Sequence, residues 1–294
     1  MSVQFQIEEY HRPRDLVQAI EILSRYGGKA RVIAGGSDIL PLRPGLKKND
    51  SIHHLVDISN LGLNYLKKEN DHIRIGAATD INTIGASRLF SSRPYRALSE
   101  AADAHSTTTI KNRATVGGNL CSASPCADLA LPLLVLDAIL VAAGPDGVRE
   151  ISIENFFKGA NYTALDTDEI LLEIRIPQCP PKAGTAFVKL RRQQTAIDMA
   201  VVNTAAFLTC NKGRCEVARI ALGAVAPISL RAKKAESVLA GAELSEGIVQ
   251  KAAATAAEEA RPIDDLRATA AYRKKMVKVL VRRSLENSMQ RCGS

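Results

Sequence analysis

Thr115-Val116-Gly117-Gly118-Asn119 places two adjacent glycines between β-branched residues and an asparagine. Because glycine has no Cβ atom, this stretch predicts a tight turn whose backbone can come close to a ligand. A second stretch of this kind, Val32-Ile33-Ala34-Gly35-Gly36-Ser37-Asp38-Ile39, occurs far upstream. We call residues 32–39 the first glycine loop and residues 115–119 the second. The pair predicts one binding site lined by two segments that are distant in sequence.

The first glycine loop is expected at the end of a short strand, Arg31-Val32-Ile33-Ala34. It lacks the Gly-x-Gly-x-x-Gly pattern of a Rossmann fold, and Pro41 and Pro44 follow too soon for a long crossover helix. It also lacks the Gly-Lys-Ser/Thr of a P-loop. A phosphate here would therefore be held by backbone N–H groups and by the hydroxyl of Ser37.

The composition is that of a folded protein of two or three domains, with 294 residues of which 46% are hydrophobic and 24% charged. No apolar run approaches the roughly 18 residues that span a bilayer, and the first residues lack the layout of a signal peptide. We therefore expect a cytoplasmic protein without a membrane span. The six cysteines contain no Cys-x-x-Cys and are interpreted as reduced thiols rather than as a disulfide framework.

The formal net charge of +8 raises the question of a nucleic-acid partner. Much of the excess lies in single basic residues and in the carboxy-terminal segment, aromatic residues are only 4%, and tryptophan is absent. Platforms on which bases could stack are therefore scarce. We expect no nucleic-acid partner; solvated faces or an acidic protein partner explain the charge as well.

Short strands and helices alternate in the first half of the chain. The apolar spacing of Leu16 to Leu23 predicts a helix, with Asp15 in its first turn and Gly27-Gly28 at its end. Thr79 is expected to cap another helix. The remaining elements expected here are strands at 55–58, 73–77, 138–143 and 148–153 and helices at 94–104 and 129–136.

Residues 169–177 alternate in polarity and predict a strand with Leu172, Ile174 and Ile176 on a core face. Leu171 is then expected to point the other way. Pro180-Pro181 and Gly184 mark a domain boundary, after which strands are expected at 186–190, 201–209 and 215–225 and helices at 229–239, 245–260 and 267–287. A sheet followed by helices predicts an α+β fold.

Several motifs taken together resemble the FAD-binding subunit of the molybdenum hydroxylases, the group that includes xanthine dehydrogenase and carbon monoxide dehydrogenase. They are Ala34 to Leu40, Ile110 to Asn119, Ser124 to Leu129, Phe187-Val188-Lys189 with Asp198 and Ala200, and Arg267 to Arg273. The resemblance implies a vanillyl-alcohol-oxidase-type fold, with two α/β subdomains (about 1–58 and 59–178) that hold FAD. A carboxy-terminal domain (179–294), a small antiparallel sheet with helices, follows.

The resemblance also implies which residues contact FAD. By position they are the two glycine loops (Val32, Ile33, Ala34, Gly35, Gly36, Ser37, Asp38, Ile39; Thr115, Val116, Gly117, Gly118, Asn119) and His105, Asp128, Leu171 and Lys189. Glycine loops at strand ends offer N–H donors to a diphosphate, and an outward Leu171 would contact the flavin ring. A lysine near the isoalloxazine would raise the reduction potential. His105 replaces the apolar residue that is usual in the family.

Without the resemblance, other interpretations of these residues stay open. Asp128 would also complement a helix N-terminus, and Lys189 would also suit a solvated strand end. Cys121 and Cys126 form a poor ligand set, and the chain lacks the cysteine-bearing insertion of the 4-hydroxybenzoyl-CoA reductases. We therefore expect no metal in this subunit and no catalytic residue on it.

The partners implied by the resemblance are a small subunit with [2Fe-2S] clusters and a large molybdopterin subunit, in a dimer of heterotrimers. This chain has no cysteine set for a cluster. Electrons are expected to pass from a partner's cluster through FAD to an external acceptor, while the molybdenum subunit selects the substrate. The alternatives are a self-contained FAD-dependent oxidase or dehydrogenase of the same fold and a basic binding module without a cofactor.

Overall fold

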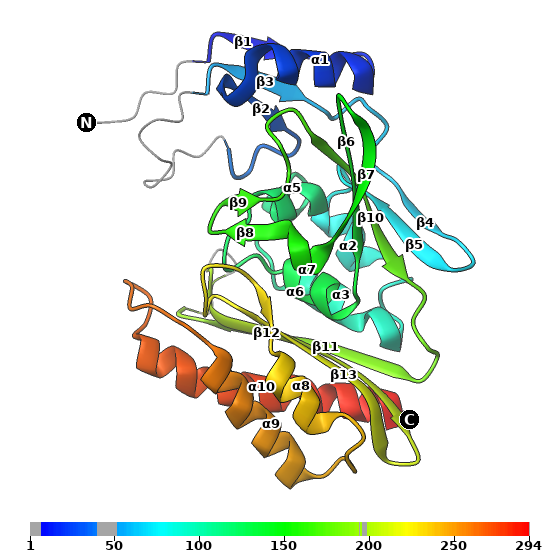
Figure 1. Ribbon diagram of the computed structural model, residues 1–294, viewed down its shortest axis with the longest axis vertical. Coiled ribbons are helices and arrows are strands. Elements are labelled where there is room, and N and C mark those ends of the chain that lie inside the picture. Colours follow the sequence, from blue (N-terminus) through cyan, green and yellow to red (C-terminus); the bar gives the residue numbers. More distant parts are fainter. Residues whose placement is uncertain (1–6, 40–51, 194, 196–198, 294) are drawn as a thin grey trace.

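The computed structural model describes residues 7–39, 52–193, 195 and 199–293. Leu40, Pro41, Pro44 and Asp198, which carry some of the expectations above, lie outside this part of the chain. The described elements stack in order of sequence, with a small sheet at one end, a larger sheet in the middle and a third sheet with its helices at the other end (Figure 1).

The amino-terminal sheet is parallel, in the order β1-β3-β2, and is packed by one helix. Asp15 caps that helix by accepting a hydrogen bond from the Gln18 N–H, and Gly27 ends it in a left-handed conformation (φ +53°). The predicted helix is therefore confirmed. The elements are β1 (Glu9–His11), α1 (Leu16–Tyr26), a 3-10 turn (Gly27–Lys29), β2 (Ala30–Ile33) and β3 (His54–Asp57).

The middle sheet is antiparallel, in the order β4-β5-β10-β6-β7, and short helices pack around it. Its strands are β4 (Leu66–Lys68), β5 (His72–Gly76), β6 (Ile139–Gly144), β7 (Gly147–Ser152) and β10 (Ile170–Pro177). The surrounding elements are α2 (Ile81–Ala86), a 3-10 turn (Arg93–Tyr95), α3 (Arg96–Asp103), α4 (Thr108–Lys111), α5 (Val116–Cys121), α6 (Ala130–Val135), α7 (Ile153–Phe156), β8 (Phe157–Gly159) and β9 (Tyr162–Thr163). The β6–β7 hairpin confirms the predicted one.

Two local predictions in this region are wrong. The N-cap of α2 is Asp80 and not Thr79, whose hydroxyl instead bonds the backbone of Tyr65. The second glycine loop is not a bare turn, because Thr115 caps α5 and the glycines form its first turn. Glycine is a poor helix former, so the local sequence did not predict this helix, which tertiary contacts stabilise.

Strand β10 contains a β-bulge between Leu171 and Glu173, which shifts the phase of its side chains. Leu171 therefore joins Ile174 and Ile176 in the core of the middle domain, whereas Leu172 packs toward the amino-terminal sheet. The expected grouping of Leu172 with Ile174 and Ile176 is wrong. Leu171 does not point outward; it is only 4% exposed.

Glu173 on β10 is a buried carboxylate held by three partners. It accepts hydrogen bonds from the Tyr65 hydroxyl and, at 2.6 Å each, from Arg74 Nε and Arg175 Nε. Burial alone would raise the pKa of Glu173, but the three hydrogen bonds outweigh it and lower the pKa below 4.5. Burial and the neighbouring Glu173 carboxylate raise the pKa of Tyr65 to about 12.

This lowered pKa predicts how Glu173→Gln changes acid stability. The folded protein holds the carboxylate ionised, so its stabilisation is complete above the ordinary pKa of 4.5 and is lost as the pH falls through the lowered value. We expect the variant to lose about 1–3 kcal/mol at pH 7 and to show a shallower loss of stability in acid. Urea midpoints at pH 7 and pH 4 measure both effects. Parallel acid profiles for variant and wild type would contradict this account.

The third sheet is antiparallel, in the order β11-β12-β13-β14, and three helices follow it in sequence. Its elements are β11 (Ala183–Arg191), β12 (Ala200–Asn211), β13 (Arg214–Gly223), β14 (Leu230–Arg231), α8 (Lys233–Leu239), α9 (Glu246–Glu259) and α10 (Ala270–Gly293). The helices lie on one face of the sheet, and the middle domain lies on the other (Figure 1). Phe207 of β12 accordingly belongs to the middle core, and its neighbour Leu208 belongs to the helical core. The chain is an α+β protein, as predicted.

Two of the six cysteines, Cys210 at the end of β12 and Cys292 in α10, form a disulfide. The expectation that all six are reduced is therefore wrong. The two residues are 82 positions apart, so the sequence pattern could not predict that they pair. The packing of α10 on the sheet brings them together. None of the helices in the described residues is both long enough and apolar enough to cross a membrane.

Candidate functional site

The two glycine loops meet. A Cβ atom on Gly35 would lie 1.8 Å from the backbone oxygen of Arg113 and 3.0 Å from Cα of Ala114. These residues directly precede Thr115, the start of the second loop. Only glycine permits such a close approach between two backbones. Because Gly35 has no side chain, the backbones of the two loops can pack directly against each other.

Most backbone N–H groups of the second loop are hydrogen-bonded within the protein. Those of residues 116–119 already have an acceptor in the protein, at 2.9 to 3.0 Å: Thr79 O for Val116, Ala77 O for Gly117, Thr115 Oγ1 for Gly118 and Thr115 O for Asn119. A Cβ on Gly117 would lie 2.6 Å from the Ala77 oxygen. Glycine at this position therefore lets α5 pack closely against Ala77, the residue that follows β5. Four of the five amides in the second loop are thus occupied by the protein's own acceptors.

The first loop has the predicted place at the end of β2. Ile33 and Ile39 pack into a small apolar cluster with Leu55, which fixes both ends of the loop. Between them Gly36 takes a left-handed conformation (φ +73°). Within the described part of the chain, no acceptor takes a hydrogen bond from the N–H of Gly36 or Ser37. This loop therefore retains the donors that a phosphate group needs.

Three predicted site residues from distant segments form one buried polar cluster. Lys189 Nζ on β11 lies 2.6 Å from Asp128 Oδ2, and His105 Nδ1 lies 3.4 Å from the same oxygen. The side chains of Lys189 and Asp128 are only 3% and 4% exposed. Lys189 is thus not a solvated strand-end residue. Asp128 does not cap a helix either, since the N-cap of α6 is Leu129 without a side-chain bond.

Asn203 and Arg191 belong to this cluster, although the sequence analysis did not select them. Asn203 Nδ2 on β12 donates to Asp128 Oδ1 at 3.0 Å. Arg191 and Lys189 both donate to the backbone oxygen of Ala104, the C-cap of α3, where positive charge is favourable. The available signal was an asparagine within an apolar strand, because a buried amide needs a polar partner.

Asn119 connects the second glycine loop to the polar cluster. Its Oδ1 accepts a hydrogen bond from the N–H of Leu129 at 3.2 Å, next to Asp128 in the chain. The candidate site is therefore continuous from the first loop, through the second, to the cluster. Leu171 belongs to the same buried core as Val116 of α5.

Some buried polar atoms of the cluster make no hydrogen bond within the described residues. His105 Nδ1, Asn203 Oδ1 and Arg191 Nε are buried and have no hydrogen-bond partner among the described residues. Buried polar atoms are normally paired, so an unpaired group of donors and acceptors suits a ligand with a polar edge. A flavin has such an edge, and the first loop can serve its diphosphate. The residues present fit FAD.

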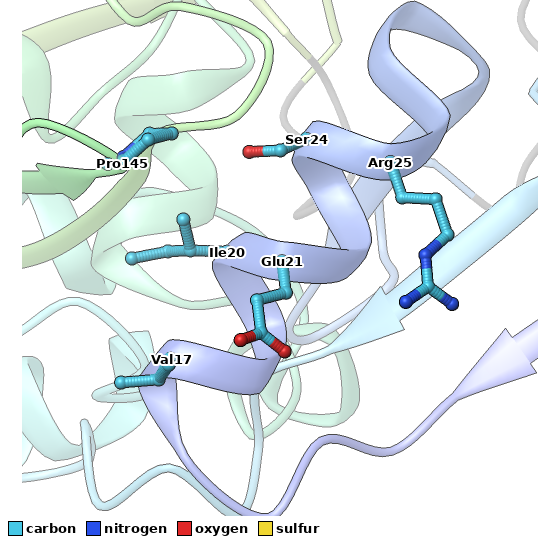
Figure 2. Close-up of a pocket in the computed structure, with 7 residues that line it drawn as sticks. Val17, Ile20, Glu21, Ser24, Arg25 and Pro145 are labelled. Atoms are coloured by element: carbon cyan, nitrogen blue, oxygen red, sulfur yellow. The ribbon is translucent and has the colours of Figure 1, made fainter.

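A cavity of about 790 Å³ lies elsewhere, between α1 and the β6–β7 turn (Figure 2). Val17, Ile20 and Ser24 of α1 face Pro145 across it, and none of the predicted cofactor residues lines it. It is therefore separate from the glycine loops.

Two family models together match nearly the whole chain. Residues 3–179 match the family model described as the FAD binding domain in molybdopterin dehydrogenase. Residues 185–288 match the one described as the CO dehydrogenase flavoprotein C-terminal domain. This chain belongs to the FAD-binding subunits of the molybdenum hydroxylases. It is an oxidoreductase subunit whose cofactor is FAD, which rules against a basic binding module without a cofactor.

Relatives within the molybdenum hydroxylase family cover nearly all of the chain. The carbon monoxide dehydrogenase medium chain of Afipia carboxidovorans is 33% identical over 96% of this chain and 97% of its own length. The xanthine dehydrogenase FAD-binding subunit of Escherichia coli O157:H7 is 30% identical over 98% of each chain. The structure of carbon monoxide dehydrogenase from Hydrogenophaga pseudoflava superimposes with a TM-score of 0.92 at 32% identity, over 99% of this chain and 100% of the other. Both the family and the fold expected from the motifs are confirmed.

Proposed function

We propose that this subunit takes electrons from a [2Fe-2S] cluster on a partner subunit and passes them through its FAD to an external acceptor. The supporting observation is that both matched regions are flavoprotein domains and together extend over nearly the whole chain. FAD supplies a centre that accepts electrons singly and releases them in pairs. The residues of this chain bind and orient it, and no side chain here is required for acid–base chemistry.

The first glycine loop would hold the diphosphate of FAD through the N–H groups around Gly36 and through Ser37, beside the second loop that Gly35 contacts. The polar cluster would bind a polar edge of the flavin. Lys189 is neutralised by Asp128 at 2.6 Å, so the pair offers the cofactor a fixed dipole rather than the field of an isolated cation. The expected rise in reduction potential from Lys189 is therefore small.

We further propose the division into domains at residue 178, with subdomains about 1–58 and 59–178, and assembly with a [2Fe-2S] subunit and a molybdopterin subunit as a dimer of heterotrimers. The relatives named as medium chains support a multi-subunit enzyme. A cytoplasmic location is proposed from the four free cysteines, which suit a reducing compartment. Cell fractionation tests this: recovery in the cytoplasmic fraction is expected, and recovery in an oxidising compartment, where the Cys210–Cys292 disulfide would be stable, would count against it.

The experiment that tests electron transfer compares the isolated chain with the native complex. We expect the isolated chain to retain yellow FAD that dithionite bleaches but that carbon monoxide, purines, N-heteroaromatics and aldehydes do not. The complex recovered by native affinity capture should contain iron, sulfide and molybdenum, and its FAD should bleach with one of these substrates. Bleaching of the isolated chain by a substrate would instead establish the self-contained oxidase or dehydrogenase.

A further inference from the structure

Three of the chain's five histidines gather at one end of the amino-terminal sheet. His11 lies on β1, and His53 and His54 lie where β3 begins. The parallel register sets Glu9 opposite His54, and Glu9 and His11 share a face because they are two residues apart on a strand. The sheet thus brings Glu9, His11 and His54, which we call the β1–β3 triad, to one place.

The three ligand atoms of the triad are spaced as metal ligands. His11 Nε2 lies 3.2 Å from His54 Nδ1 and 3.6 Å from Glu9 Oε2, and His54 Nδ1 lies 4.0 Å from Glu9 Oε2. A triangle with these sides has a circumscribed radius of about 2.1 Å, which is the length of zinc–nitrogen and zinc–oxygen bonds. One ion can therefore contact all three atoms with little movement of the protein.

We propose that the β1–β3 triad binds a divalent transition-metal ion of the zinc class. Two imidazoles and a carboxylate are ligands that such an ion prefers. The histidines are nearly buried, with side chains 11% and 9% exposed, whereas Glu9 is 57% exposed. The ion can thus enter past Glu9, and water completes its coordination.

Two neighbouring residues, Tyr26 and Glu8, lie beside the His54 ring. The ring of Tyr26 stacks on it, with centroids 3.7 Å apart. The carboxylate of Glu8 lies 4.0 Å from His54 Nε2, the nitrogen opposite the proposed ligand atom. At this distance Glu8 adds negative charge near the site but makes no hydrogen bond to the ring.

The proposed site is separate from the FAD site. His54 pairs with Ala30 at the start of β2, whereas Gly35 and Gly36 of the first glycine loop follow the other end of that strand. A bound ion would fasten the three-residue strand β1 to β3. This proposal replaces the expectation of no metal, which considered only cysteines as ligands.

Metal titration of the full-length, untagged chain tests the proposal. After treatment with a chelator, the protein should bind one Zn²⁺ with micromolar or tighter affinity in calorimetry and should melt at a higher temperature with zinc. Co²⁺ in its place should give visible absorption bands. We expect His11→Ala and His54→Ala each to weaken binding by at least about tenfold. Glu9→Gln, a change at an exposed side chain, should also weaken binding while the metal-free chain remains folded.

His72→Ala is the matched control, because His72 lies on β5 beside Glu69 and Asp71 and belongs to a different sheet. It should leave zinc affinity unchanged, and all variants should retain their FAD. Failure of the wild-type chain to bind zinc at micromolar concentrations would overturn the proposal. So would zinc binding that persists undiminished in the three triad variants.

Discussion

Gly35→Ala is expected to abolish FAD retention and to destabilise the protein strongly. The new methyl group would lie 1.8 Å from the backbone oxygen of Arg113, an atom that no side-chain rotation can move away. Overpacking commonly costs about 1–3 kcal/mol, and a clash with backbone lies at or beyond the upper end of that range. Relief requires the glycine loops to separate, which removes the support behind the first loop. Flavin absorbance per chain and the thermal midpoint measure the two effects.

Gly28→Ala is the control for this prediction. Gly28 lies in the 3-10 turn after α1, and a Cβ there would meet nothing within 4 Å. This variant should bind FAD normally and melt close to the wild-type temperature. If Gly35→Ala kept its full complement of FAD and the wild-type midpoint, the contact between the two loops would not matter for the site.

The second large effect is expected from Asp128→Asn. This change leaves the Lys189 ammonium buried without its counter-ion, and breaking a buried ion pair in this way costs about 3–5 kcal/mol. The cofactor should also be lost, because Lys189 and Asn203 both donate hydrogen bonds to this carboxylate and His105 lies 3.4 Å from it. Urea unfolding of the FAD-free chain gives the stability, and gel filtration followed by a visible spectrum gives the retained FAD.

The double variant Asp128→Asn with Lys189→Met separates these two consequences. Removing both charges leaves no buried ion, so most of the lost stability should return. Retention of FAD should not return, since the cluster no longer presents the same polar groups. Lys189→Met alone completes the comparison. If the stability lost in the double variant equalled the sum of the losses in the two single variants, Asp128 and Lys189 would not be coupled, in conflict with their 2.6 Å separation.

The sequence predicted those features that depend on local pattern. Asp15 and Gly27 mark the ends of α1 as expected, and the β6–β7 hairpin forms around its turn. The motifs that resemble the family were distinctive enough to indicate the fold and the cofactor. Residues placed by family position also met in space, since His105, Asp128 and Lys189 form one cluster.

The errors arise where distant contacts override the local pattern. Alternation alone could not show the bulge in β10 that turns Leu171 inward. Glycines 117 and 118 gave no helical signal, because capping by Thr115 and packing on Ala77 determine their conformation. The Cys210–Cys292 disulfide and the partnership of Asn203 with Asp128 each join strands and segments far apart in the chain. Neither follows from spacing.

The origin of the polar cluster restricts how such subunits can recombine. His105 and Asp128 come from the first family-matched region, whereas Lys189 and Asn203 come from the second. A chimaera that joined the front half of this protein to the back half of a homologue would inherit a working centre only if the incoming half carried a matching lysine and amide. The boundary near residue 180 therefore does not divide the polar cluster, and an exchange of either region has to preserve the partners that the other supplies.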